Sequence, residues 1–337
     1  MSQPHSNELS IPAKVPCYCM PVLGQSLSRF NEGDMIADHR FLLIDDGPIS
    51  PSDLADVYRA HDSKTPKDPS VAIKIFREPN NEVARQTTRE LEAHIALNGI
   101  SHIVKTRAIG TLTDGPSPQR YVATALADTT LEQKICSETS QRKRAELMIK
   151  MTAQIIPAII AMHDRGYIHR DIKTANFIGY SNGDYWALTD FGLVEATDEK
   201  LKRASSRDER LWSYPTEQSG VSGTPGYTAP ELLNNPSLLS TKSDIFSWGV
   251  TAYRTLTGEL PFRAEGRDVT EKFTIYKQSV SYEAPAEVKK LNPSVLPELN
   301  EITMSSLENR PENRATGAQW LDLLSAIGVK DLVKSGS

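Results

Sequence analysis

The sequence predicts an α+β fold of two lobes: a small antiparallel sheet with one main helix, followed by a larger and mostly helical lobe. Short apolar runs separated by polar turns, at 41–44, 57–60 and 71–76, are typical of antiparallel strands. Beyond residue 140, apolar residues recur every three or four positions, which is typical of helices. A chain of 337 residues accommodates one such two-lobed domain with extensions.

The composition of the chain limits which classes of partner are expected. Hydrophobic residues make up 39% and charged residues 24%, as in ordinary globular proteins, and the net charge is −5. This negative charge argues against nucleic acid or an anionic membrane as the main partner. The chain has no run of eighteen apolar residues and no secretory signal at its start, so we expect a cytoplasmic protein without a membrane span. The sequence indicates no oligomeric state.

Changes in composition suggest the domain limits. Residues 1–37 hold several prolines and only short apolar pieces, so we expect a tail or an extension lying on the domain. The small lobe is predicted at 38–126 and the large lobe at 127–331. A short C-terminal tail is expected at 332–337.

The expected elements follow in chain order. After the three strand runs, a helix is predicted over 82–97, and a long helix over 141–165. Residues 178–188 alternate around Asn182-Gly183, a strong hairpin signal. Two later helices are predicted over 243–257, with Ser243 as a possible N-cap, and over 316–327.

Two segments joined by this hairpin carry the chemistry: HRDIKTAN at 169–176 and DFG at 190–192. Phosphoryl transfer requires an acceptor oxygen aligned with phosphorus and charge neutralised by cations and metal. Asp171 is placed to accept the acceptor hydroxyl's proton, and Lys173 points to the same side to reach the γ-phosphate. Asn176 and Asp190 supply the hard oxygen ligands that Mg²⁺ prefers.

With VAIK at 71–74 and GTPGYTAPE at 223–231, these segments resemble the catalytic domain of eukaryotic-like serine/threonine protein kinases, over about 40–330. The resemblance implies the bilobal protein-kinase fold, ATP as co-substrate with Mg²⁺ or Mn²⁺, and protein substrates with Ser or Thr acceptors. Lys173 and Thr224 match the serine/threonine class. Small-molecule kinases of related fold lack the 223–231 motif.

The resemblance also implies an ATP site. Lys74 would hold the α- and β-phosphates and pair with Glu90, with Glu92 as the alternative. Ala123 would gate the space behind adenine. The remaining ATP-binding positions come from strands, hinge and phosphate loop: Val57, Ala72, Ser50, Ser52, Ala55, Thr124, Leu126 and Ile178.

Structural and regulatory roles follow from the same resemblance. Glu231 would form a buried ion pair with Arg314, and Asp244 would hold the backbone of the catalytic loop. The segment after Asp190 is longer than the family usually needs, and a phosphate on it could pair with Arg170. The candidate phosphorylation sites are Thr216, Ser219 and Ser222, then Ser205 and Ser206; the alternative is a solvated loop without regulation.

One segment departs from the pattern. Where the family has Gly-x-Gly-x-x-Gly, residues 50–55 read SPSDLA. Because glycine permits close backbone approach to phosphate, we expect weakened or unusual ATP binding, and glycines at Ser50, Ser52 and Ala55 should lower the ATP KM. Gly47 could serve as an early glycine of a longer hairpin. This departure leaves a second reading open: a pseudokinase that acts as a binding or scaffolding module.

Overall fold

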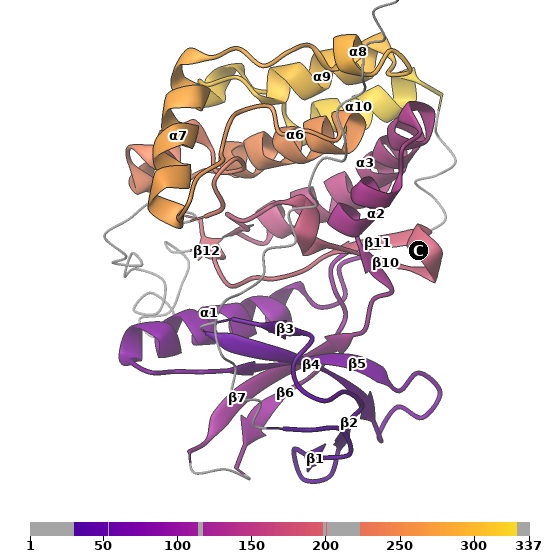
Figure 1. Ribbon diagram of the computed structural model, residues 1–337, viewed down its shortest axis with the longest axis vertical. Helices are drawn as coiled ribbons and strands as arrows, with labels where there is room; N and C mark the ends of the chain where they lie inside the picture. Colours follow the sequence, from indigo (N-terminus) through magenta and orange to yellow (C-terminus); the bar gives the residue numbers. More distant parts are fainter. Residues whose placement is uncertain (1–29, 53, 114–116, 198–199, 201–222, 329–337) are drawn as a thin grey trace, which may run out of the picture.

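The computed structural model describes residues 30–52, 54–113, 117–197, 200 and 223–328. It confirms the two-lobed α+β architecture: Figure 1 shows the N-terminal sheet at one end, the helices at the other, and one helix of the small lobe beside the boundary. The predicted phosphorylation sites Thr216, Ser219, Ser222, Ser205 and Ser206 lie outside the described residues, as do the two predicted tails except 30–37.

The small lobe is a sheet in the order β1-β2-β4-β5-β7-β6, with β3 paired to β4 and every pairing antiparallel. Its first strand lies inside the segment predicted as a tail, and Phe30 packs against the sheet core. The strands are β1 (Met35–Ile36), β2 (Phe41–Leu43), β3 (Ser50–Pro51), β4 (Ala55–Asp62), β5 (Ser70–Phe76), β6 (Thr106–Leu112) and β7 (Gln119–Ala125).

Helix α1 (Asn81–Leu97) confirms the helix predicted in the small lobe. The side chain of Asn80 accepts hydrogen bonds from the backbone of the first turn, which satisfies amides that have no partner inside the helix. Its buried face joins both hydrophobic cores: Leu91 packs with the sheet, whereas Ala93 and Leu97 belong to the large-lobe core. The helix is therefore positioned by both lobes.

The large lobe is built on α3 and α6, which pack together and against α9 and α10. Fully buried Trp248 and Trp320 meet edge to face at 5.8 Å in this core. Its elements are β8 (Thr129–Thr130), α2 (Leu131–Ser137), α3 (Gln141–Asp164), β9 (Tyr167–Ile168), β10 (Phe177–Tyr180), β11 (Tyr185–Leu188), β12 (Glu195–Ala196), α6 (Thr241–Thr257), α7 (Val269–Tyr282), α8 (Val288–Leu291), α9 (Pro297–Ser306) and α10 (Gly317–Ala326).

The predicted hairpin is confirmed as β10 and β11, with Phe177 opposite Leu188. Its connection contains a short helical turn, Ser181–Gly183, in which Asn182 (φ 58°) and Gly183 (φ 88°) adopt the left-handed region. The connection is thus longer than a two-residue turn. Because Asn176 directly precedes β10 and Asp190 lies two residues after β11, the hairpin brings the two segments together.

The predicted N-cap of α6 is wrong. The helix begins at Thr241 and its cap is Ser240, while Ser243 closes a reciprocal capping box from the third helical position. At the other end Gly258 takes a left-handed conformation (φ 87°) that ends the helix, where an added Cβ would strike the side chain of Arg144.

In the described part of the chain, α3 is the one helix long and apolar enough to cross a membrane by length and composition. More than half of its apolar window, 56%, is buried inside the protein, against α6, α10 and β11. That burial is typical of the core helix of a globular lobe.

Candidate active site

A cavity of about 750 Å³ lies between the sheet and the helical lobe. Its lining combines strands β3, β4, β5 and β7 with the segment after β7 and the start of β10, so both lobes contribute. It brings together all ten residues that were predicted to bind ATP: Lys74, Glu90, Val57, Ala72, Ser50, Ser52, Ala55, Thr124, Leu126 and Ile178. Its size suits a nucleotide-sized ligand.

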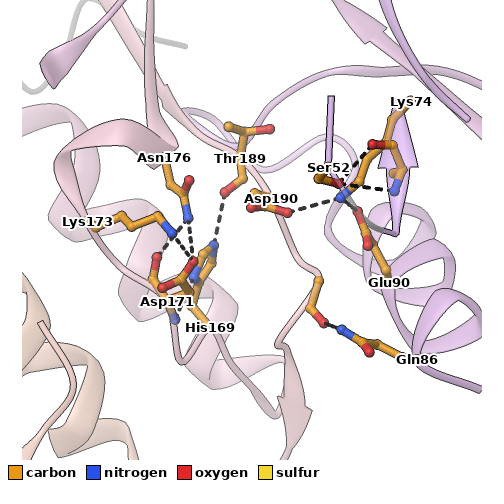
Figure 2. A network of polar contacts seen from close by, with 12 residues as sticks. Ser52, Lys74, Gln86, Glu90, His169, Asp171, Lys173, Asn176, Thr189 and Asp190 are labelled. Atoms are coloured by element: carbon orange, nitrogen blue, oxygen red, sulfur yellow. Dashed lines mark hydrogen bonds and ion pairs between the residues drawn. The ribbon is translucent and has the colours of Figure 1, made fainter. Parts of the chain in front are cut away.

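The charged wall of this cavity is formed by Lys74, Glu90 and Asp190 (Figure 2). Lys74 Nζ lies 2.6 Å from Glu90 Oε1 and 3.2 Å from Asp190 Oδ1, so the prediction that Lys74 pairs with Glu90 is confirmed. Burial works against the charged ammonium, but the two carboxylates outweigh it and raise the pKa of Lys74. Lys74 therefore stays a cation, fixed at the cavity wall.

Figure 2 shows side chains of the catalytic segment, residues 169–176, on the other side of Asp190 from Lys74. Thr224 Oγ1 donates to Asp171 Oδ1 (2.6 Å) and accepts from Lys173 Nζ (2.9 Å), while Lys173 also contacts Asp171 Oδ2 (2.6 Å). A hydroxyl oxygen is thus held between a carboxylate and an ammonium. An acceptor alcohol placed here would meet a proton acceptor and a cation.

Asn176 and Asp190 fit a divalent cation. Asn176 Nδ2 donates to the Asp171 carbonyl (2.9 Å) and to Asp171 Oδ2 (3.1 Å), which leaves its side-chain oxygen as the remaining ligand. Lys74, opposed by burial, lowers the pKa of Asp190, so that carboxylate is ionised. The described residues contain no group of three or more His, Cys, Asp or Glu side chains suited to a metal. Two oxygen ligands suit Mg²⁺ or Mn²⁺ that is also held by nucleotide phosphates.

Asp244 fixes the backbone of the catalytic segment, as predicted. Its carboxylate accepts from the amides of His169 (2.9 Å) and Arg170 (2.9 Å) and contacts His163 Nε2 (2.8 Å). Burial opposes ionisation of Asp244, but hydrogen bonding and charge from the histidines lower its pKa. Arg170 (φ 68°) and Asp190 (φ 67°) adopt left-handed backbone conformations that are costly for residues other than glycine. The hydrogen bond from the Arg170 amide to Asp244 helps to hold Arg170 in this conformation.

Phe191 links helix α1 to this segment. It is fully buried, and its ring lies 4.9 Å from the His94 ring and 5.6 Å from the His169 ring. Burial lowers the pKa of His94 to about 3, so its imidazole is neutral and Nδ1 pairs with Thr106 Oγ1 at 3.0 Å. Sequence reasoning missed His94. Its position one helical turn after Glu90, on the same face of the helix, could have indicated that it lies near the site.

A second network that sequence reasoning missed braces Thr174, between Lys173 and Asn176. Thr174 Oγ1 contacts Glu132 Oε2 (2.5 Å) and the Tyr227 hydroxyl (2.9 Å), and Arg254 Nε donates to the same Glu132 oxygen (3.0 Å). Burial opposes ionisation of Glu132, but hydrogen bonds from Arg254 and Thr174 lower its pKa. These residues are distant in sequence and form no motif, so no local signal reveals them.

The predicted gate at Ala123 is wrong. Side chains alternate across strand β7, so Ala123 packs into the sheet core while its neighbours Val122 and Thr124 line the cavity. Thr124, predicted as part of the hinge, is the small side chain that faces the ligand space.

The predicted ion pair of the large lobe is confirmed. Arg314 grips Glu231 with both terminal nitrogens, at 2.8 and 2.6 Å. Its other hydrogen bonds go to the carbonyls of Glu308, Asn309 and Lys242, and its side chain is fully buried. This bidentate pair ties the segment at 231 to that before α10.

Arg170, which was predicted to pair with a phosphate, forms an ion pair with another residue of the described chain. Its NH1 lies 2.9 Å from Glu195 Oε1, and Arg89 NH1 from α1 approaches the same oxygen at 3.4 Å. Sequence reasoning did not foresee this pairing.

The loop that lacks glycines is closed by a serine. Ser52 Oγ donates to the Ala55 carbonyl (2.8 Å) and accepts from the Ala55 amide (3.1 Å), and Arg77 NH1 donates to the Ser52 carbonyl (2.7 Å). Ser50, Ser52, Leu54 and Ala55 have no positive φ, so these positions do not require glycine. Gly47 lies in a bend before β3 and is not part of this turn.

The structure therefore changes the expectation for Ser52. Ser52→Gly removes both side-chain hydrogen bonds and frees the backbone, so the ATP KM should rise about 5- to 150-fold, since each bond contributes about 0.5–1.5 kcal/mol and the two together contribute about 1–3 kcal/mol. Steady-state kinetics across ATP concentrations measures it, with Ser63→Gly, in a distant exposed turn, as control. A fall in KM for Ser52→Gly would instead support the original expectation that glycines improve binding.

The two-lobed fold and the cavity between the lobes agree with the architecture that the resemblance implied. The chain belongs to the protein kinase family: a sequence model of the protein kinase domain matches residues 53–324.

Named relatives are serine/threonine protein kinases. The chain is 33% identical to serine/threonine-protein kinase mos of Patiria pectinifera over 201 residues, 59% of this chain and 54% of that protein. It is 29% identical to Pkn1 of Myxococcus xanthus over 50% of this chain and 22% of that protein. It is 26% identical to PknB of Mycolicibacterium smegmatis over 77% of this chain and 39% of that protein. The chain thus spans about half or less of the length of these relatives.

Proposed function

We propose that this chain transfers the γ-phosphate of ATP to serine and threonine hydroxyls of proteins, with Mg²⁺ or Mn²⁺ as cofactor. The observation that carries the proposal is the hydroxyl of Thr224 held between Asp171 and Lys173. An acceptor hydroxyl in that position loses its proton to Asp171 while Lys173 offsets the charge of the transferring group. The relatives' names support the class of acceptor.

The other residues take complementary roles. Lys74, held by Glu90, orients the α- and β-phosphates, and Asn176 with Asp190 would hold the cation. The chemistry supplied by such a cation is neutralisation of phosphate charge. Residues of this chain would supply the alignment of the acceptor and the acceptance of its proton.

Replacing Lys74 by methionine tests the proposal. Label from γ-labelled ATP should enter a general protein substrate with Mg²⁺ and fall by about 10²-fold or more in Lys74→Met, because one positioned charge is removed. Asp184→Asn, which alters an exposed carboxylate paired with Lys150, is a surface control and should keep full activity. Nucleotide binding without transfer would favour the binding-module reading, and label confined to a small metabolite would favour a small-molecule kinase.

Autophosphorylation of Thr216, Ser219 or Ser222 stays a prediction, and so does a cytoplasmic location. Arg170 lies beside Asp171, where a phosphate could act on the catalytic segment, but Glu195 already contacts that arginine. Mass spectrometry after incubation with ATP would detect the modification. Absence of phosphate between residues 193 and 224 would contradict regulation of this kind.

A further inference from the structure

The two arginines around Glu195 each directly precede a group of the proposed machinery. Arg89 comes before Glu90, the partner of Lys74, and Arg170 comes before Asp171. Both guanidinium groups approach one oxygen, Glu195 Oε1, at 3.4 and 2.9 Å. One carboxylate therefore joins α1 of the small lobe to the catalytic segment of the large lobe.

The three side chains of this contact are largely buried, so their charges are poorly screened by water. The side chains of Arg89, Arg170 and Glu195 are only 5%, 9% and 13% exposed. Burial lowers the pKa of Arg89, Arg170 and Arg85 add to that effect, and Glu195 opposes it. Burying two neighbouring cations is costly, and Glu195 offsets part of that cost because its carboxylate approaches both guanidinium groups.

Backbone pairing fixes the position of the carboxylate. Glu195 lies in strand β12 opposite Ile168 of β9, the residue directly before His169. Helix α1 contacts this segment a second time, through Gln86 Nε2 and the Gly192 carbonyl at 2.8 Å (Figure 2). The segment from 192 to 195 thus supplies two polar contacts to helix α1.

We propose that Glu195 is a positioning residue whose carboxylate, bridging Arg89 and Arg170, aligns helix α1 with the catalytic segment without any phosphate on the chain. The effect on kcat rests on the proposed function, whereas the effect on α1 does not. The carboxylate of Glu195 takes the place at Arg170 that was predicted for an added phosphate, so this proposal competes with regulation by autophosphorylation.

Three variants test the bridge: Glu195→Ala, Arg89→Gln and the double variant. Each single change should lower kcat at least tenfold with a smaller change in the ATP KM, and the double variant should be no slower than the slower single, because both changes break one link. Formate should restore kcat of Glu195→Ala in a concentration-dependent way by occupying the space between the arginines, whereas chloride of equal ionic strength should not. Phosphatase treatment should leave kcat of the unmodified protein unchanged.

Hydrogen exchange of residues 81–97 supplies a readout that needs no activity: it should speed up in Glu195→Ala and Arg89→Gln but not in the control Asp184→Asn. If the unmodified protein transfers no phosphate, the proposed function fails and exchange alone decides the bridge. The proposal would be overturned if folded Glu195→Ala had the hydrogen exchange and the kcat of the unmodified protein. It would also be overturned if the losses of kcat multiplied in the double variant, or if phosphatase treatment lowered the kcat of the unmodified protein. Should Glu195→Ala not fold, Arg89→Gln, which keeps the Arg170–Glu195 pair, decides it by the same two readouts.

Discussion

Replacing Asp171 by asparagine lowers kcat by about 10²–10⁴-fold, while the affinity for ADP changes by less than about threefold. Asparagine keeps the size of the side chain but cannot accept the proton of the acceptor hydroxyl. In the unmodified protein both carboxylate oxygens of Asp171 are engaged, one by Thr224 and the other by Lys173 and Asn176. Rapid-quench measurement of labelled product, beside calorimetry with ADP, separates chemistry from binding.

Asp184→Asn is the matched control for this change, because it makes the same chemical replacement at an exposed site outside the cavity. It should retain parental kcat. A folded Asp171→Asn protein with parental kcat would exclude Asp171 as the proton acceptor.

Replacing Arg314 by methionine lowers the free energy of unfolding by about 3–5 kcal/mol, because the buried carboxylate of Glu231 loses its cationic partner and keeps only the hydrogen bond from Ser243. Three backbone carbonyls, of residues 308, 309 and 242, lose their donor as well. Urea denaturation followed by circular dichroism measures the change.

An exposed arginine gives the control for stability. Arg142→Met breaks the surface pair with Glu146, where the arginine is 83% exposed, and should cost no more than about 0.5 kcal/mol. Adding Glu231→Leu to Arg314→Met should recover part of the loss, since no buried charge then stays unpaired. An unfolding free energy of Arg314→Met equal to that of Arg142→Met would show that the pair contributes little.

Features carried by local chemistry could be predicted from the sequence. Asp171, Lys173 and Asn176 lie within six residues, and a hairpin signal joins them to Asp190, so type and spacing sufficed. Strands β2, β4 and β5, helix α1 and the Glu231–Arg314 pair followed from sequence patterns and from resemblance to a family. The prediction that Lys74 meets Glu90 came from the resemblance, which places the partner of this lysine on the next helix.

Features that depend on tertiary packing could not be predicted. Ala123 was placed one residue out of phase, and in a strand a shift of one residue moves a side chain to the opposite face. The serine-closed turn at Ser52 depends on hydrogen bonds within its own loop and on Arg77, which directly follows β5. The bridge by Glu195 brings together an acid and two arginines from three separate segments.

Phosphoamino-acid analysis tests most directly whether this cleft transfers phosphate to protein hydroxyls. The unmodified protein, incubated with γ-labelled ATP, Mg²⁺ and a general protein substrate, should place label on serine and threonine. The same reaction with Asp171→Asn should leave both unlabelled. A folded, nucleotide-binding protein that labels neither residue, or that labels them equally well without Asp171, would contradict the proposed function.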